Sequence, residues 1–185
     1  MQALDLLLNR VSVGRLLEPA PDAMQRELML RAALRAPDHG QLRPWRFITV
    51  EGEARVHLGE LFAAALAQNP ANRPEALEKA RAMPLRAPLL ILVVARLSEH
   101  PKVPQEEQLL SAGCAAHALL LAAQALGFGA VWRTGELAYH PHVLAGLGLQ
   151  TGERLIGFIY LGSFEGERRV PPPLTPADFV SAWRG

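Results

Sequence analysis

The sequence has few of the residues that mark several classes of protein. Its 185 residues include a single cysteine, Cys114, which excludes an internal disulfide framework and a cysteine-rich zinc or iron–sulfur site. The 19 Lys and Arg residues nearly balance 18 Asp and Glu residues, so the net charge is only +1. A nucleic-acid-binding protein normally carries a basic excess or stripe. We therefore expect a reducing compartment and no nucleic acid among the partners.

Long hydrophobic runs are also scarce. The longest apolar stretch, 112–126, is shorter than the roughly 20 residues that a membrane-spanning helix needs, and it contains His117 and Gln124. The first residues do not place a charged segment before an apolar one, as a signal peptide would. These features predict a cytoplasmic protein with no membrane partner.

Lysine is rare as well. Only Lys79 and Lys102 are lysine among the 19 basic residues, and the others are arginine. Arginine binds phosphate bidentately, so this bias suits a phosphorylated ligand. Apolar residues make up 50% of the chain, and the length predicts a single domain over 1–185. Beyond 162 the chain is rich in proline and arginine, which predicts an extended C-terminal arm over about 163–185.

Apolar periodicity predicts helices and strands in mixed order. Helical patterns cover 3–9, 23–35, 53–68, 75–83, 105–126 and 143–147. Strand patterns cover 45–50, 88–95, 130–132 and 155–161, and the run 88–95 is typical of a strand buried on both faces. Such an order predicts one sheet covered by helices and leaves the direction of strand pairing open.

The longest predicted helix is apolar on nearly every side from Ala112 onward. A helix of that kind must be buried all round. A domain of this size has limited room for it, so we expect part of the helix to pack against a second subunit in a homodimer. Cys114 lies there among Ala and Gly without a basic neighbour, which predicts a buried, inert thiol.

Motifs of several enzyme classes are absent or incomplete. The sequence contains neither a Walker A motif nor a GxGxxG motif after a strand. His140 and His142 flank a proline without a third ligand nearby, so a polar loop is favoured and no metal is expected. The stretch 124–130 fits a pyrophosphate motif of acetyl-CoA-dependent N-acetyltransferases, but it ends a helix instead of beginning one. Gly127 is better explained as a helix-terminating glycine, and the acyltransferase remains a remote alternative.

Three segments concentrate residues that bind phosphates and rings. Residues 10–15 place Arg and Ser two apart beside a glycine, which can hold a phosphate by charge-assisted hydrogen bonds. Residues 35–45 place Arg, Asp, His and Gln in a connection shaped by Pro and Gly, and such loops often carry sites. Residues 127–135 lead a short strand with Trp132 and Arg133 into a glycine-bounded turn. Each segment alone also has an ordinary structural explanation.

In order and spacing these segments together resemble the FMN-dependent nitroreductase family, and most of all its branch of short NAD(P)H nitroreductases. The resemblance runs from Ala3 to about Leu161. It is carried by Leu8-Asn9-Arg10-x-Ser12, Arg35-Ala-Pro-Asp-His39, Pro44-Trp45, Lys102-Val-Pro, Ser111-Ala-Gly-Cys-Ala, Gly127-Phe-Gly, Trp132-Arg133 and Gly157-Phe-Ile-Tyr-Leu-Gly162.

The resemblance implies an α+β fold with a central, mainly antiparallel sheet flanked by helices. It also implies an intertwined homodimer with two FMN sites at the subunit interface and NAD(P)H as co-substrate. In the family the Arg-x-Ser segment holds the FMN phosphate and ribityl oxygens, and the segment at 131–133 is expected to reach the flavin from the other subunit. The implied FMN-binding residues are Arg10, Val11, Ser12, Arg35, His39, Gln41, Val131, Trp132 and Arg133.

The sequence also departs from the family pattern. The usual Asn-x-Gln-Pro-Trp is replaced by Gln41-Leu42-Arg43-Pro44-Trp45, and Arg43 is expected to add positive charge near the site. Arg35, Gln41 and Arg133 are unranked candidates for stabilising the reduced flavin.

The resemblance implies that hydride passes from NAD(P)H through flavin N5 to a nitroaromatic, a quinone or a similar electrophile by a ping-pong mechanism. The flavin carries this chemistry, so no protein nucleophile is expected. A flavin-binding protein with vestigial or unknown activity is the main alternative.

Overall fold

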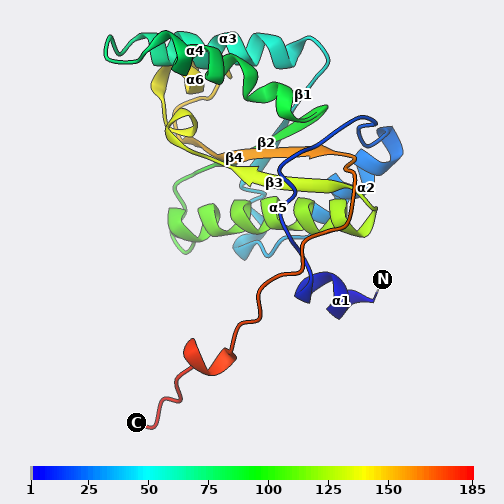
Figure 1. The fold of residues 1–185 in the computed structure, drawn as a ribbon. Helices are drawn as coiled ribbons and strands as arrows, with labels where there is room; N and C mark the ends of the chain where they lie inside the picture. The colour runs from blue at the N-terminus through cyan, green and yellow to red at the C-terminus, as the bar shows by residue number, and fades with distance from the viewer. Residues whose placement is uncertain (1) are drawn as a thin grey trace.

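The computed structural model describes residues 2–185 and contains one four-stranded sheet with helices on both faces (Figure 1). The strand order is β1-β2-β4-β3, and every neighbouring pair is antiparallel. The expected α+β fold with an antiparallel sheet is therefore confirmed. The strands are β1 (Trp45–Glu51), β2 (Leu89–Arg96), β3 (Gly129–Arg133) and β4 (Glu153–Gly162).

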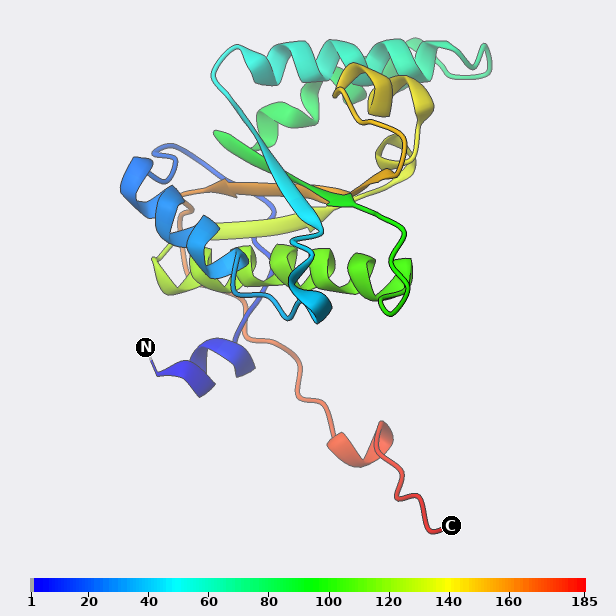
Figure 2. The same ribbon diagram turned by 180° about the vertical axis from the view of Figure 1, so that it is seen from behind.

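The helices form two layers. Helices α3, α4 and α6 cover one face of the sheet, and α2 and α5 cover the other, as the two opposite views show (Figures 1 and 2). Short helix α1 lies outside both layers, near the point where the C-terminal arm leaves the domain. The helices are α1 (Ala3–Leu8), α2 (Ala23–Ala33), α3 (Ala54–Ala67), α4 (Pro74–Ala82), α5 (Gln105–Ala125) and α6 (Pro141–Gly146).

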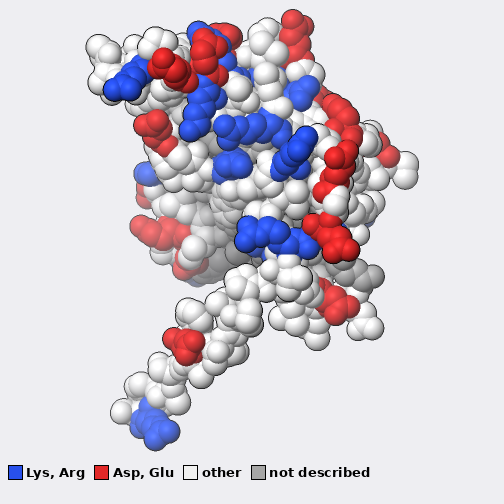
Figure 3. Space-filling view, in the orientation of Figure 1, with Lys and Arg blue, Asp and Glu red and all other residues white. Residues whose placement is uncertain are grey.

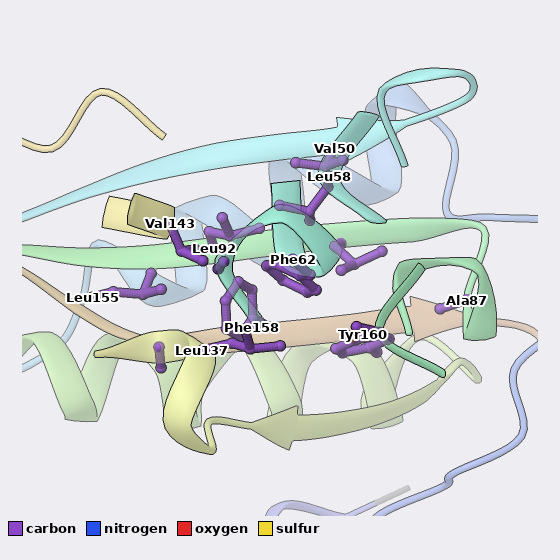
Figure 4. Close-up of a cluster of buried hydrophobic side chains, with 14 of the residues drawn as sticks. Val50, Leu58, Phe62, Ala87, Leu92, Leu137, Val143, Leu155, Phe158 and Tyr160 are labelled. Carbon is purple, nitrogen blue, oxygen red and sulfur yellow. The ribbon is translucent and has the colours of Figure 1, made fainter. Parts of the chain in front are cut away.

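Strand β2 is buried on both faces, as its unbroken apolar run predicts. Alternate residues point to opposite faces of a strand, so Leu90 and Leu92 join the cluster under α3, while Leu89 and Ile91 join the cluster over α5. Figure 4 shows the first cluster, in which the rings of Phe62 and Phe158 meet edge to face with centroids 5.3 Å apart. The two clusters fix the sheet between the helical layers.

Helix α5 differs from its prediction in one respect. Its inner face is buried against the sheet, but Leu110 is 70% exposed, and Cys114 and His117 are exposed as well. The prediction of a buried thiol was wrong, because Cys114 lies on the outer face of the helix. Of the described helices only α5 is long and apolar enough to resemble a membrane span, and half of that window is buried inside the chain.

The two ends of the chain lie along the free edge of the sheet. Leu17 and Ser163 form an isolated antiparallel bridge with two backbone hydrogen bonds of 2.8 Å each. Beyond this bridge the arm extends away from the domain and carries the exposed side chains of Phe179 and Trp183 (Figure 1). Helix α1 has no buried residue.

Candidate functional site

Residues 9–13 are attached to the edge of the fold at several backbone atoms. The N–H of Val13 donates to the carbonyl oxygen of Ala130 in β3, 2.9 Å away. Before it, the side chain of Gln124 at the end of α5 bonds to the backbone of Asn9 and Val11. The segment that carries the Arg-x-Ser motif is thus fixed against both β3 and α5.

A groove runs between this segment, α5 and β3. We call it the edge groove; its volume is about 480 Å³, and it is lined by Arg10, Ser12, His117, Leu120, Trp132 and Thr134. A smaller groove of about 240 Å³, the arm groove, shares residues of the same motif, and it is lined by Arg10, Val11, Ser12, Arg169, Val170, Pro171 and Pro172. Arg10 and Ser12 therefore face two adjoining hollows.

The charge on this face is mainly positive. In Figure 3, Lys and Arg side chains gather in the middle of the face that carries β3 and the two chain ends, while Asp and Glu lie toward its borders. None of the ion pairs formed within residues 2–185 uses Arg10 or Arg133. Guanidinium groups without a carboxylate partner beside a groove favour an anionic ligand.

Trp132 is positioned by an irregularity in β4. The register between β2 and β4 shifts at Val93 and Val94, and one extra residue, Ile156, bulges there. A bulge frees a backbone group from the ladder, and the indole N–H of Trp132 donates to the carbonyl oxygen of Ile156 at 3.2 Å. Gly157 makes room for this contact, since a Cβ atom there would lie 2.2 Å from the indole nitrogen.

Trp132 and Arg133 point to opposite faces of the sheet. Trp132 lines the edge groove on the α5 side, and Arg133 reaches a third hollow on the α3 side, the Arg86 pocket. Its volume is about 340 Å³, and it is lined by Phe62, Met83, Arg86, Trp132, Arg133, Thr134, Gly135, Leu137, Phe158 and Tyr160.

Tyr160 forms part of the wall of the Arg86 pocket. The guanidinium carbon of Arg133 lies 5.8 Å from the centre of its ring. Burial raises the pKa of Tyr160 to about 12, against the opposing effect of Arg133 and Arg86. The phenol is therefore neutral at physiological pH. Sequence reasoning missed Arg86, because an exposed arginine in a short turn carries no signal until the fold brings it beside Arg133.

The predicted residues of the second segment lie elsewhere. The Nδ1 atom of His39 is 2.7 Å from Glu107, in the first turn of α5. Gln41 has a left-handed backbone with φ of 54°, and its side-chain oxygen accepts from Arg43. Arg43 also pairs with Asp38 at 2.7 Å while its side chain remains 58% exposed, and the expectation that it adds positive charge near the site stays a prediction.

The predicted FMN contacts thus form two groups at opposite ends of α5. Glu107, beside His39, and Gln124, beside Arg10, are 17 positions apart, or about 25 Å along the helix axis. Val131 packs in the core under α3, while Trp132 shares the edge groove with Arg10 and Ser12. The structure therefore brings 131–133 to the Arg-x-Ser motif within one chain, whereas 35–41 lie apart from it. Whether 131–133 also reach a flavin held by the other subunit stays a prediction.

Comparison with known proteins decides the family. The sequence pattern of the Nitroreductase family matches residues 7–163. The chain belongs to the nitroreductase family. It is 47% identical over 166 residues to "Putative NAD(P)H nitroreductase YdjA" of Escherichia coli, with 88% of each chain covered. It is 40% identical over 183 residues to a protein of the same description from Haemophilus influenzae, covering 98% of this chain and 99% of that one.

Solved nitroreductase structures share the fold. A nitroreductase-like family protein from Bacillus cereus superposes with a TM-score of 0.84 at 24% identity, covering 100% of this chain and 97% of that one. A protein from Desulfovibrio desulfuricans, solved in complex with FMN, gives a TM-score of 0.75 at 22% identity, with 98% and 96% covered.

The nitroreductase fold also explains the motif shared with acyltransferases. The N–H of Gly127, whose φ is +90°, donates to the carbonyl of Gln124, and the N–H of Phe128 donates to that of Ala123. These two bonds are those of a Schellman motif, which ends a helix. Both N–H groups are used, so the stretch offers no phosphate cradle. At the HxH pair, His140 accepts from the N–H of His142 and caps α6.

Proposed function

We propose that this chain is an FMN-dependent oxidoreductase that uses NAD(P)H to reduce nitroaromatics, quinones or similar electrophiles. The family and the names of its relatives support the class of enzyme. The observation that best supports an FMN site is the edge groove beside β3. It brings together the guanidinium of Arg10, which forms no ion pair within residues 2–185, the hydroxyl of Ser12 and the indole of Trp132.

The donors present fit a flavin phosphate. Arg10 supplies a fixed positive charge and Ser12 a hydroxyl. Within residues 2–185 the backbone N–H groups of Arg10 and Ser12 form no hydrogen bond. Free N–H groups, a hydroxyl and a guanidinium are the donors that an anionic phosphate needs. Arg169, on the arm, brings a second guanidinium to the same motif through the arm groove.

The groove walls suit the remainder of the molecule. Trp132 and Leu120 offer apolar surface, while Thr134 and the adjoining turn offer polar groups. When bound, FMN supplies hydride acceptance at N5 from NAD(P)H and donation to the acceptor. Arg10 and Ser12 would hold the phosphate, and Trp132 would contact the rest of the molecule. Arg133 and Arg86 would supply positive charge from the adjoining Arg86 pocket, which also contains Trp132, and such charge favours an anionic reduced ring.

A second copy of the chain completes the site in this proposal. His39, beside Glu107, is about one α5 length from Arg10 in the same chain, so one flavin is not within reach of both residues. A homodimer in which 35–41 of one subunit meet the edge groove of the other uses all the predicted residues. The exposed leucines of α1 and the apolar side chains of the arm are then covered by the partner. We also place the enzyme in the cytoplasm.

Anaerobic reduction of the FMN-loaded protein tests the activity and follows the two half-reactions, flavin reduction and flavin reoxidation, one at a time. NADH or NADPH is expected to bleach the flavin absorbance, and a nitroaromatic or quinone added afterwards is expected to restore it without further pyridine nucleotide. Bleaching that no acceptor reverses would favour the vestigial alternative. A protein that neither binds FMN nor oxidises NAD(P)H would contradict the proposal.

A further inference from the structure

Gln124 makes contacts that a helix residue does not need for the helix itself. It is the second-to-last residue of α5, and it is only 5% exposed. Its side-chain oxygen accepts from the N–H of Val11 at 3.3 Å, and its side-chain nitrogen donates to the carbonyl oxygen of Asn9 at 3.1 Å. Both bonds go to the backbone on either side of Arg10. We call this pair of bonds the Gln124 clamp.

The Gln124 clamp imitates the pairing of two strands. In an extended chain the carbonyl of one residue and the N–H two residues later point to the same side, where a neighbouring strand would bind them. The amide of Gln124 takes that place, and β3 continues the pairing by accepting from Val13 at 2.9 Å. The carbonyl of Asn9 and the N–H groups of Val11 and Val13 are thereby bonded on the inner side. The N–H groups of Arg10 and Ser12 are left without a partner in residues 2–185.

We infer that Gln124 is a positioning residue that sets the preference for phosphorylated flavin. This inference rests on the proposed function, in which Arg10 and Ser12 hold the phosphate. The Gln124 clamp fixes the backbone between two bonds, so the guanidinium, the hydroxyl and the free N–H groups are held in place before the ligand arrives. Such preorganisation lowers the entropic cost of ordering these groups when the ligand binds.

The other buried glutamine of α5 provides the matched control. Gln108 is 1% exposed, and its side chain bonds to the backbone of Ser98 and Val103 at distances of 2.9 to 3.2 Å. It therefore fixes a loop at the opposite end of the same helix by the same chemistry. Loss of either amide removes comparable bonds, but only Gln124 touches the Arg-x-Ser segment.

The test compares the affinities of FMN and riboflavin, which differ only in the phosphate. Gln124→Met fills nearly the same volume without either hydrogen bond, and Gln108→Met does the same at the control position. Dissociation constants for both ligands are measured by quenching of flavin fluorescence on the apoprotein, together with the melting temperature. We expect Gln124→Met to lower the preference for FMN over riboflavin by about tenfold or more, with riboflavin affinity little changed.

A preference that is unchanged in Gln124→Met, or reduced equally in Gln108→Met, would overturn the inference. If Gln124→Met does not fold, Gln124→Asn retains an amide that is one methylene too short for both bonds, and the same loss of preference is expected. A wild-type protein that binds FMN no better than riboflavin would overturn the proposed phosphate site, and the inference with it.

Discussion

Individual side chains at the edge groove owe their roles to neighbours that are distant in sequence. The Arg-x-Ser spacing identified Arg10 and Ser12 from the sequence, and the structure places both at one groove. It could not identify Gln124, because a bond between residues 124 and 11 depends on the tertiary fold. The same limit applies to the ion pair of Arg43 with Asp38, which forms across a turn with left-handed residues that the sequence does not reveal.

Replacing Arg10 tests the phosphate contact. Arg10→Ala is expected to weaken FMN binding by about 10- to 100-fold, since hydrogen bonds to charged groups contribute roughly 1.5 to 3 kcal/mol. Arg15→Ala removes an exposed arginine that lines neither groove and serves as the control. Titration of the apoproteins with FMN gives both affinities. Equal affinities in wild type and Arg10→Ala would contradict the assigned contact.

Glu153 makes the stability of the fold depend on pH in the acidic range. Its carboxylate forms two 2.7 Å bonds with Arg46. The hydrogen bond to Arg46 is the main reason why its pKa falls from 4.5 to about 2. The folded state therefore binds the proton less well than the unfolded state, so this stabilisation is present above pH 4.5 and disappears as the pH falls toward 2.

The expected contribution is on the order of 2 kcal/mol at neutral pH. Glu153→Gln should lower the free energy of unfolding by about that amount at pH 7, and the two proteins should converge as the pH falls toward 2. Urea unfolding at a series of pH values measures this. A gap that stays constant down to pH 3 would show that Glu153 does not titrate in this way.

At the scale of elements, the sequence predicted each helix and strand to within a few residues. Apolar periodicity was strong in β2 and α5, and proline and glycine bounded most other elements. The apolar pattern could predict neither the strand order nor the bulge in β4, and the antiparallel pairing was expected only from the family resemblance. A bulge depends on which residues face each other across two strands, and the pattern within one strand does not contain that information.

The bulge yields a prediction for Trp132. Gly157→Ala places a methyl group where the indole lies, so it is expected to displace Trp132, break its bond to Ile156 and cost about 1 to 3 kcal/mol. Gly113→Ala is the control, because a Cβ atom at that helical glycine meets nothing within 4 Å. Thermal unfolding should show a lower melting temperature, and titration should show a weaker affinity for FMN, in Gly157→Ala but not in Gly113→Ala. If Gly157→Ala bound FMN as tightly as the wild type, the bulge in β4 would have no role in FMN binding.

The whole molecule presents apolar surface that a monomer leaves in water. The arm exposes Phe179 by 74% and Trp183 by 92%, and α1 exposes Leu4 by 68% and Leu8 by 72%. Exposed apolar residues gathered on projecting segments mark interaction surfaces. The sequence predicted a homodimer from the apolar character of α5, and the structure adds these two segments as candidate contacts.

Shortening the arm tests its part in assembly. Deletion of 173–185 removes Phe179 and Trp183 but retains the residues of the arm groove. The shortened protein is expected to fold with little change in its circular dichroism and to dimerise at least about tenfold more weakly. Sedimentation over a range of concentrations gives both dissociation constants. Identical constants would show that the arm makes no contact with the partner.

The visible absorption spectrum of the freshly purified protein, with chromatography of the compound released by heat, decides whether the chain carries FMN. We expect a yellow protein that releases close to one FMN per subunit. A colourless protein that also takes up no added FMN would contradict this expectation.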